Sequence, residues 1–433
     1  MYSVLVYLNE GWRPEDGGAL RVFEKGPGNA LRLHDTDAGD SHVDVLPEAG
    51  TLVVMRSDAV PHEVMESFKD RWAVVAWFRA NRRDCEKPHP LLDSTAFQAA
   101  QRFEARGFDR AALEALNRVV AETDTERAYV EIRKAHICFD GLDDLEGAAR
   151  HWNNALAIED SVVALNGLGL VEADASLRRG WHDRALAYAP RDARSAVLAL
   201  AADADASADG VVECDLYRRL DAASPHLTAA LNFILGSGGA HLRRGTRAML
   251  AVAVDAARGR AGDVLECGVY HGRSLRMFRE LTDRPMHGFD SFEGLPEAWG
   301  HEPAASYSYA RDTGGAQLPS VDGAQMHAGW FSDTLPPFLA KQAPGYAPAI
   351  VHLDCDLYSS TMDVLAALGK AARDGTAGGL EGTVLVFDDY LGGHETWMQD
   401  QHKALLDAAN DFGWRYEYIA LSLVTKQAVV RIL

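Results

Sequence analysis

The pattern of hydrophobic and polar positions changes twice along this chain of 433 residues, which predicts a multidomain protein. Residues 1–83 alternate short β-branched and aromatic runs with turns rich in glycine, proline and aspartate, which predicts antiparallel strands. Residues 95–225 place apolar residues three and four positions apart, which predicts helical hairpins. Residues 226–433 alternate strand and helix patterns, which predicts a parallel sheet covered by helices. The stretch 84–94 is the expected linker.

Composition and charge narrow the classes of protein that this chain can represent. The formal net charge of −20 does not favour nucleic acid or an anionic membrane as a partner. No apolar run reaches the roughly 18 residues of a membrane span, and the first residues lack a signal-peptide pattern. The five cysteines include no CxxC pair, which argues against a disulfide scaffold or zinc ribbon. We therefore expect a cytoplasmic location.

The helical region, residues 95–225, resembles hairpins of the tetratricopeptide type, although no clean repeat of roughly 34 residues is visible. It contains no convergent set of acids, histidines or cysteines. We expect it to dock a protein partner or a second copy of the chain rather than to perform chemistry.

In the third region, a glycine turn follows the first strand and an acid ends the second. The turn runs from Glu266 to Gly272, and the second strand ends at Asp290 and Ser291. Glycines let a ligand approach the backbone, and an acid at this tip suits ribose hydroxyls. Asp and Ser are also common helix caps, so a purely structural role stays open. Because the turn lacks the GxGxxG form, the pattern favours S-adenosylmethionine over a dinucleotide.

Two further strands end in acids. The fourth ends in Asp354, Cys355 and Asp356, and the fifth in Asp388 and Asp389. If the strands are neighbours, about 4.8 Å apart, the carboxylates repel one another unless a cation neutralises them. A hard, oxygen-liganded cation such as Mg²⁺ fits this arrangement. The alternative is that these acids cap helices or bind backbone groups.

Five motifs in this region, LECGVYHGRS, GFDSFEGLPEAW, GWFSDTLP, VHLDCDLYSSTMDVLAAL and VLVFDDY, resemble the macrocin O-methyltransferase (TylF-type) family. The resemblance covers the last 190 or so residues. It implies a class I methyltransferase fold of Rossmann-like α/β type, S-adenosylmethionine as donor, and Mg²⁺. Characterised members methylate sugar hydroxyls on natural products, so a small-molecule hydroxyl acceptor is expected.

The resemblance also implies roles for individual residues. The implied cofactor residues are Glu266, Gly268, Tyr270, Gly272 and Ser274 near the methionine end, Asp290 and Ser291 at the ribose, and Gly329 and Trp330 by the adenine. The implied metal ligands are Asp356, Asp388 and Asp389, and Asp356 is also the implied catalytic base. Residues 301–322 match the family less well and are expected to form a lid or substrate loop.

The motifs YSVLVYLNEGW, GGALRVF, PEAGTLVVMRSDAVPHEV and RWAVVAWF in the first region resemble prolyl-hydroxylase-like iron and 2-oxoglutarate oxygenases. The resemblance implies part of a jelly-roll-like domain, with His62 as an iron ligand and Arg71 as the 2-oxoglutarate anchor. The family's His-x-Asp pair has no counterpart, because His34 and Asp37 have the wrong order and spacing and are expected in a loop. Two explanations follow: a longer natural chain, or a vestigial half-domain.

The leading hypothesis is therefore an S-adenosylmethionine-dependent, Mg²⁺-assisted O-methyltransferase. One alternative is a 2-oxoglutarate hydroxylase, which an upstream His-x-Asp segment would support. The other is a non-enzymatic scaffold built on the helical region, which would gain support if the acids held no metal and the turn no cofactor.

Overall fold

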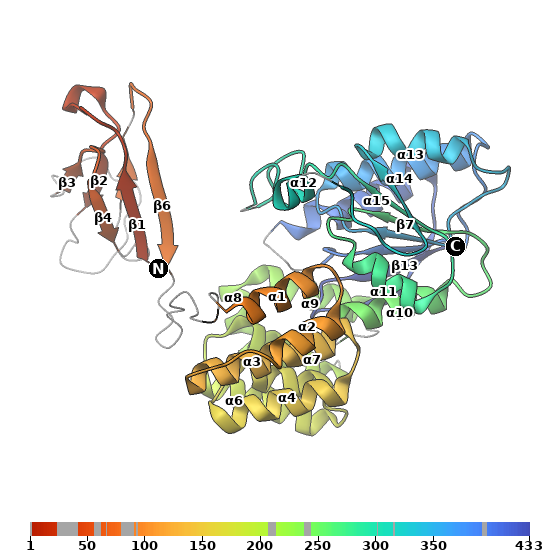
Figure 1. Ribbon diagram of the computed structural model, residues 1–433, viewed down its shortest axis with the longest axis horizontal. Helices are drawn as coiled ribbons and strands as arrows, with labels where there is room; N and C mark the ends of the chain where they lie inside the picture. The colour runs from red at the N-terminus through yellow and green to blue at the C-terminus, as the bar shows by residue number, and fades with distance from the viewer. Residues whose placement is uncertain are drawn as a thin grey trace. The chain divides into compact units, whose positions relative to one another are not determined.

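The computed structural model describes residues 2–23, 42–55, 62–65, 67–78, 91, 94–206, 214–237, 244–300, 302–314, 317–391 and 396–433. The chain forms two compact units, Met1–His89 and Pro90–Leu433 (Figure 1). Most of the expected linker lies outside the described residues. The helical and α/β regions, which the sequence treats as separate domains, lie together in the second unit.

In its described parts, the first unit contains two three-stranded antiparallel sheets. Their strands, in spatial order, are β4 (Leu52–Met55), β1 (Tyr2–Tyr7) and β6 (Ala73–Phe78), and β3 (His42–Val45), β2 (Leu20–Phe23) and β5 (His62–Val64). Alternate residues of β1, namely Ser3, Leu5 and Tyr7, are buried. This period of two is the one expected for a strand with one covered face, and the predicted antiparallel strands are confirmed.

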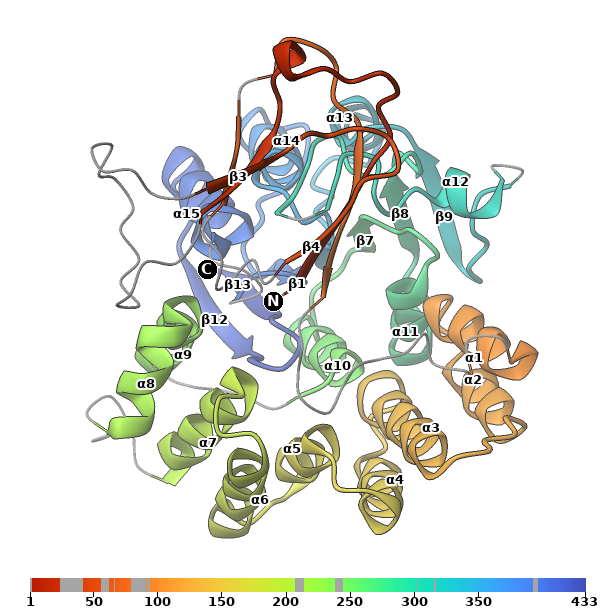
Figure 2. The same cartoon turned by 90° about the vertical axis from the view of Figure 1, so that its left-hand side faces the viewer.

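The second unit begins with a succession of helices, each packed against the next. They are α1 (Thr95–Ala105), α2 (Asp109–Leu116), α3 (Asp124–His136), the π-helical turn η3 (Ile137–Gly141), α4 (Leu145–Ile158), α5 (Val162–Val171), α6 (Ala175–Tyr188), α7 (Ala193–Ala206), α8 (Asp215–Ala223) and α9 (Pro225–Gly236). Side-chain caps mark several starts, such as the capping box of Thr123 and Glu126 at α3. Figure 2 shows these helices following one another in an arc. Their tetratricopeptide character stays a prediction.

The α/β part is built on a mixed sheet with seven strands among the described residues. In spatial order these are β12 (Tyr416–Leu421), β13 (Ala428–Ile432), β11 (Val384–Phe387), β10 (Ile350–Leu353), β7 (Val264–Cys267), β8 (Met286–Asp290) and β9 (Ala324–Ala328). The strands β7 to β11 run parallel, and β12 and β13 form the antiparallel hairpin that the sequence predicts.

Helices cover both faces of this sheet, as the alternation of strand and helix predicts. They are α10 (Thr246–Ala256), α11 (Arg273–Leu281), α12 (Tyr309–Thr313), α13 (Phe331–Ala340), α14 (Tyr358–Arg373) and α15 (Gln401–Phe412), with the short η5 (Trp397–Gln399). Alternate residues of β7 enter two different apolar clusters: Val264 packs in the cluster that contains residues of α10 and α11, and Leu265 in the one that contains residues of α13, α14 and α15.

The strand order reverses between β7 and β10, because β7 continues to β8 on one side while β10 continues to β11 on the other. In open α/β sheets, ligands bind beyond the carboxyl ends of the strands at such a reversal. The strand order alone therefore places a candidate site at the carboxyl ends of β7 and β10. Among the described helices, none combines the length and apolar character that crossing a bilayer requires.

Two helical glycines in the second unit provide a matched test of its packing. A Cβ at Gly167 in α5 would lie 2.2 Å from the indole of the buried Trp152, whereas a Cβ at Gly180 in α6 meets nothing within 4 Å. We expect Gly167→Ala to destabilise the unit by about 1–3 kcal/mol through overpacking. Gly180→Ala should stabilise it by about 0.5–1 kcal/mol. Calorimetric melting of both variants checks the opposite signs, and equal shifts would contradict this packing.

Candidate active site

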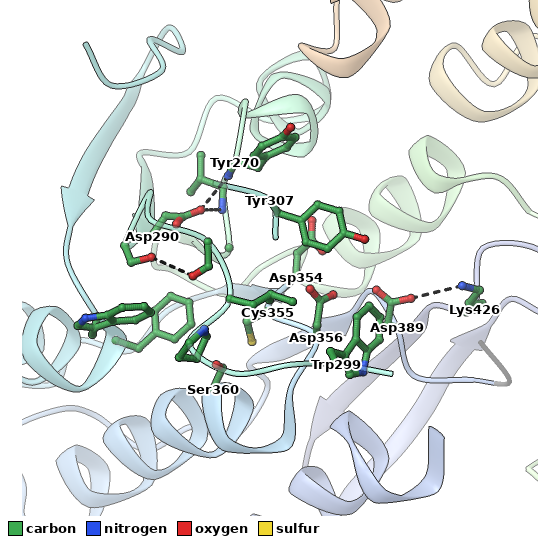
Figure 3. Close-up of a pocket in the computed structure, with 18 residues that line it drawn as sticks. Tyr270, Asp290, Trp299, Tyr307, Asp354, Cys355, Asp356, Ser360, Asp389 and Lys426 are labelled. Atoms are coloured by element: carbon green, nitrogen blue, oxygen red, sulfur yellow. Dashed lines mark hydrogen bonds and ion pairs between the residues drawn. The ribbon is translucent and has the colours of Figure 1, made fainter. Parts of the chain in front are cut away.

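A pocket of about 410 Å³ lies where the topology places a ligand site (Figure 3). Its walls come from segments that follow β7, β8, β9, β10 and β11, and from the β12–β13 turn. The lining includes Gly268, Val269, Tyr270, Asp290, Ser291, Trp299, Tyr307, Trp330, Asp354, Cys355, Asp356, Asp389 and Lys426. This volume lies within the range of about 300–1,000 Å³ that is usual for small-molecule sites.

The glycine turn is held tightly against the end of β10. Gly268 has a φ of +92°, and a Cβ there would lie 1.7 Å from the carbonyl oxygen of Asp354. No side chain fits at that distance, so glycine is required for the close approach of the two strand ends. Gly272 has a φ of +77° and is the N-cap residue of α11. The turn thus forms one wall of the pocket with its backbone.

Asp290 ties this turn to the end of β8. Its Oδ2 accepts hydrogen bonds from the backbone N–H groups of Val269 at 2.7 Å and Tyr270 at 2.8 Å. Its Oδ1 accepts from the N–H of Phe292 at 2.6 Å. The structural role that the sequence left open is therefore present. A carboxylate offers about four acceptor positions, so ribose binding by Asp290 stays a prediction.

The other predicted cofactor residues separate into two groups. Gly268, Tyr270, Asp290, Ser291 and Trp330 line the pocket. Glu266, Gly272, Ser274 and Gly329 do not line it. Gly329 nevertheless contacts a lining residue: its φ is +138°, and its N–H donates to the Asp290 carbonyl at 2.9 Å.

Glu266 belongs to a polar network that is buried beneath the pocket. Its Oε2 lies 3.1 Å from Nδ1 of His352 on β10, and Nε2 of His352 lies 3.5 Å from Oδ1 of Asp388. Burial favours the neutral imidazole, but the carboxylates of Asp388 and Glu266 outweigh it and raise the pKa of His352 to about 10. Burial alone would raise the pKa of Asp388. Its interactions with His352 and Gln427 outweigh burial and lower that pKa below its usual value.

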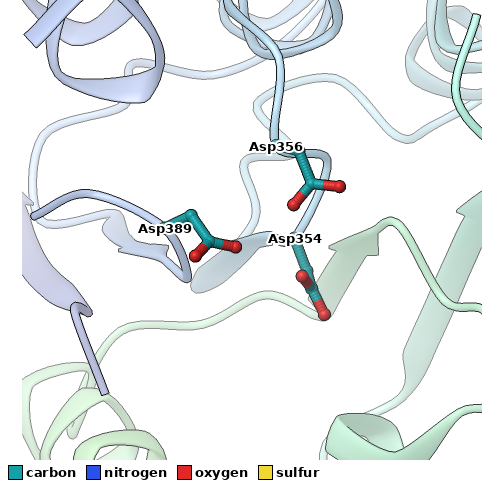
Figure 4. Close-up of side chains that lie close together, drawn as sticks. All are labelled: Asp354, Asp356 and Asp389. Atoms are coloured by element: carbon teal, nitrogen blue, oxygen red, sulfur yellow. The ribbon is translucent and has the colours of Figure 1, made fainter. Parts of the chain in front are cut away.

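Three carboxylates gather in the pocket, and two of them, Asp356 and Asp389, are predicted metal ligands. Asp354, Asp356 and Asp389 each offer an oxygen within 4.8 Å of the others (Figure 4). Asp388 does not join them, because its side chain faces His352 and also accepts a hydrogen bond from Gln427. The structure thus places Asp354 in the cluster in place of Asp388.

The electrostatics of this cluster favour the binding of a cation. Burial raises the pKa of Asp354 and Asp356 well above the usual range, and neighbouring acids raise both further. Burial also raises the pKa of Asp389. The Nζ of Lys426 lies 3.6 Å from Oδ1 of Asp389, as Figure 3 shows. One lysine at the edge leaves excess negative charge among three acids, and oxygen donors of this kind suit a hard divalent cation.

Gln401 is a site residue that the sequence analysis missed. It is completely buried at the start of α15. Its Nε2 donates to the carbonyl of Leu353 at 3.0 Å, and its Oε1 accepts from the N–H of Asp389 at 3.2 Å. It therefore joins the ends of β10 and β11, which carry the acids. A glutamine at a helix start has no distinctive local pattern, so only the structure identifies it.

The expected lid contributes to the pocket wall. Within 301–322, the structure describes all residues except 301, 315 and 316. Tyr307 lines the pocket, and burial together with nearby acids raises its pKa to about 12. Asp312 accepts a hydrogen bond from the hydroxyl of Tyr270 at 2.6 Å, which links this segment to the glycine turn.

Cys355 stands between two of the clustered acids and also lines the pocket. Burial raises the pKa of its thiol, and its Sγ lies 3.5 Å from the hydroxyl of Thr361.

The first unit contains two of the predicted site residues, His62 and Arg71. His62 is an exposed residue of β5. The Nη2 of Arg71 donates to the hydroxyl of Tyr7 at 2.9 Å, and its guanidinium lies 4.8 Å from the centre of that ring. His34 and Asp37 lie outside the described residues.

The first unit and the C-terminal part of the chain resemble two different protein families. Residues 320–404 match the family model of macrocin-O-methyltransferase (TylF), and residues 1–79 match that of the 2OG-Fe(II) oxygenase superfamily. Both resemblances predicted from the sequence motifs are thereby confirmed, the first of them as a methyltransferase domain in the C-terminal part.

Two curated relatives are O-methyltransferases. The 8-demethyl-8-(2,3-dimethoxy-alpha-L-rhamnosyl)-tetracenomycin-C 4'-O-methyltransferase of Streptomyces olivaceus is 31% identical, over 37% of this chain and 61% of its own length. The mycinamicin III 3''-O-methyltransferase of Micromonospora griseorubida is 30% identical, over 24% of this chain and 48% of its own. The chain thus spans about half to three fifths of these relatives. A solved structure, that of the O-methyltransferase NovP, is 20% identical over 44% of this chain and 81% of its own, with a TM-score of 0.30.

The hydrogen bonds of Asp290 lead to a prediction about the protein without ligand. Asp290→Asn places an amide N–H₂ near backbone donors, so we expect a loss of about 1–3 kcal/mol in stability. The amides of Val269 and Tyr270 should exchange with solvent faster, as hydrogen-exchange spectroscopy would measure. Asp322→Asn, at an exposed acid before β9, is the control and should change neither quantity. Unchanged exchange in Asp290→Asn would show that these bonds do not hold the turn.

Proposed function

We propose that the C-terminal part of this chain is an S-adenosylmethionine-dependent O-methyltransferase that acts on a hydroxyl of a sugar or sugar-bearing natural product. The observation that carries the proposal is one pocket in which a backbone-walled glycine turn faces three clustered carboxylates. The order of the sheet strands, with an antiparallel last strand inserted beside β11, agrees with the expected class I methyltransferase fold. The names of the relatives supply the reaction class.

The residues of the pocket fit the proposed methyl donor. Gly268 and Tyr270 offer a turn that a ligand can approach closely, and Asp290 and Ser291 lie at the next strand end. Trp330 is 38% exposed and lines the same pocket, so its ring offers an apolar surface to a nucleobase. These groups lie at the ends of β7, β8 and β9, on one side of the strand reversal.

The carboxylates on the other side fit Mg²⁺. Asp354, Asp356 and Asp389 would hold it, because one buried and two partly buried acids within 4.8 Å provide a donor set of hard oxygens. When bound, Mg²⁺ lowers the pKa of a coordinated hydroxyl and so favours its deprotonation. This proposal replaces the predicted ligand Asp388 with Asp354, whose contact with the glycine turn brings the acids close to the donor.

The chain's own residues account for orientation and proton transfer. Asp356 is the proposed base, because it lines the pocket and lies within the acid cluster. Gln401 fixes Asp389 beside it through the backbone. Trp299 and Tyr307 form an aromatic wall of the same pocket, which suits the apolar face of a sugar and excludes water.

Substitution of Asp356 tests the proposed mechanism. Asp356→Asn should lower kcat for methyl transfer by about 100-fold or more, because the group that accepts the proton is lost. Affinity for S-adenosylhomocysteine, measured by calorimetry, should stay nearly unchanged, since the proposed donor contacts lie on other strands. EDTA should abolish methyl transfer by the wild type, and added Mg²⁺ should restore this activity. Rates would be measured on a panel of glycosylated natural products with radiolabelled donor.

Binding of Mn²⁺, followed by electron paramagnetic resonance, tests the cation site without an acceptor. Asp354→Asn and Asp389→Asn should weaken binding, whereas Asp374→Asn, at an exposed acid after α14, should not. Wild-type protein that transfers methyl groups in EDTA would overturn the cation site but not the methyltransferase assignment. Wild-type protein without affinity for S-adenosylhomocysteine would overturn the assignment itself.

A further inference from the structure

Arg276, near the start of α11, joins the glycine turn to two distant segments of the second unit. Its Nη1 donates to the carbonyl oxygens of His271 at 2.8 Å and Gly272 at 3.0 Å, both in the turn. The same nitrogen donates to the carbonyl of Arg106 in the helical region at 2.6 Å, and Nη2 donates to that of Ser320 before β9 at 2.8 Å. A planar guanidinium with five donors can serve several acceptors at once, which an ammonium group cannot match.

The loop between α1 and α2 packs directly on this arginine. The ring centre of Phe108 lies 4.6 Å from Cζ of Arg276, within the range of a cation–π contact. A Cβ at Gly107, whose φ is +74°, would lie 3.0 Å from the Cα of Arg273, the first residue of α11. The helical region therefore reaches the backbone of α11 at the point where the glycine turn ends.

A second arginine strengthens the same junction. The Nη2 of Arg273 donates to Oδ2 of Asp140 at 2.9 Å and lies 3.8 Å from Oδ1 of Asp109. The other oxygen of Asp140 accepts from the N–H of Thr246, the first residue of α10, at 2.8 Å. Asp140 lies in the π-helical turn η3, a type of irregularity that is frequent at functional sites. The turn of η3 thus contacts the starts of both α10 and α11.

We propose that the helical region is part of the methyl-donor site, and that Arg276 is the positioning residue through which it acts on the glycine turn. Asp290 holds the N–H groups of the turn from the pocket side, and Arg276 holds its carbonyl groups from the helical side. Donor affinity therefore depends on residues of the α1–α2 loop, α2 and η3 that do not line the pocket. This inference rests on the proposed function.

Replacement of Arg276 by lysine tests the inference while it keeps the positive charge. Arg276→Lys should weaken binding of S-adenosylhomocysteine by about tenfold or more, because several charge-assisted hydrogen bonds are lost. The KM for the donor should rise, while kcat and the KM for the acceptor stay unchanged. Asp140→Asn should act in the same direction. Glu280→Gln is the control: it removes an ion pair between Arg247 and the same helix but no contact with the turn, so affinity should change by less than about twofold.

The outcomes are distinct. A folded Arg276→Lys protein with the melting temperature of the wild type and unaltered donor affinity would overturn the positioning role. If that variant does not fold, Asp140→Asn and Phe108→Leu decide in its place, and unaltered affinity in both would have the same meaning. A change in kcat with no change in donor KM would also count against the inference. Absence of binding by the wild type would instead overturn the proposed function.

Discussion

The close approach of Gly268 to the end of β10 is the constraint on which the candidate site depends. Because a Cβ at Gly268 would lie 1.7 Å from the carbonyl oxygen of Asp354, the first strand end and the acid-bearing strand end can meet only with glycine between them. This contact brings a turn suited to a nucleoside and a cluster suited to a cation into one pocket. Groups that are nearly 90 residues apart in the sequence become neighbours through it.

The polar network beneath the pocket maintains this arrangement from the other side. Glu266, His352 and Asp388 belong to β7, β10 and to the end of β11, and Glu266 and His352 are completely buried. Each of these groups would be costly to bury as an unpaired charge. Removal of one of them is therefore expected to destabilise the fold. The network therefore favours one register among three central strands, and it explains why Asp388 is not available to the acid cluster.

The sequence predicts the sheet, the two-sided helical cover and the glycine turn because each depends on local periodicity or on backbone conformations that glycine allows. It predicts that acids gather at the ends of β10 and β11, but not which ones. The side chain of Asp388 instead faces His352 of the neighbouring strand β10 and accepts a hydrogen bond from Gln427, and no local sequence pattern reveals these contacts. The sequence does not predict the role of Gln401 either, because its hydrogen bonds join segments that have no common sequence pattern.

Cys355 gives the pocket a further chemical property. Under the proposed function, an electrophilic sulfonium would occupy the same cavity as this thiol, and a thiolate there would compete with the acceptor for the methyl group. Burial raises the pKa of Cys355, which favours the protonated and less nucleophilic form of its sulfur. Burial of this thiol would thus also limit alkylation of the protein by its own methyl donor.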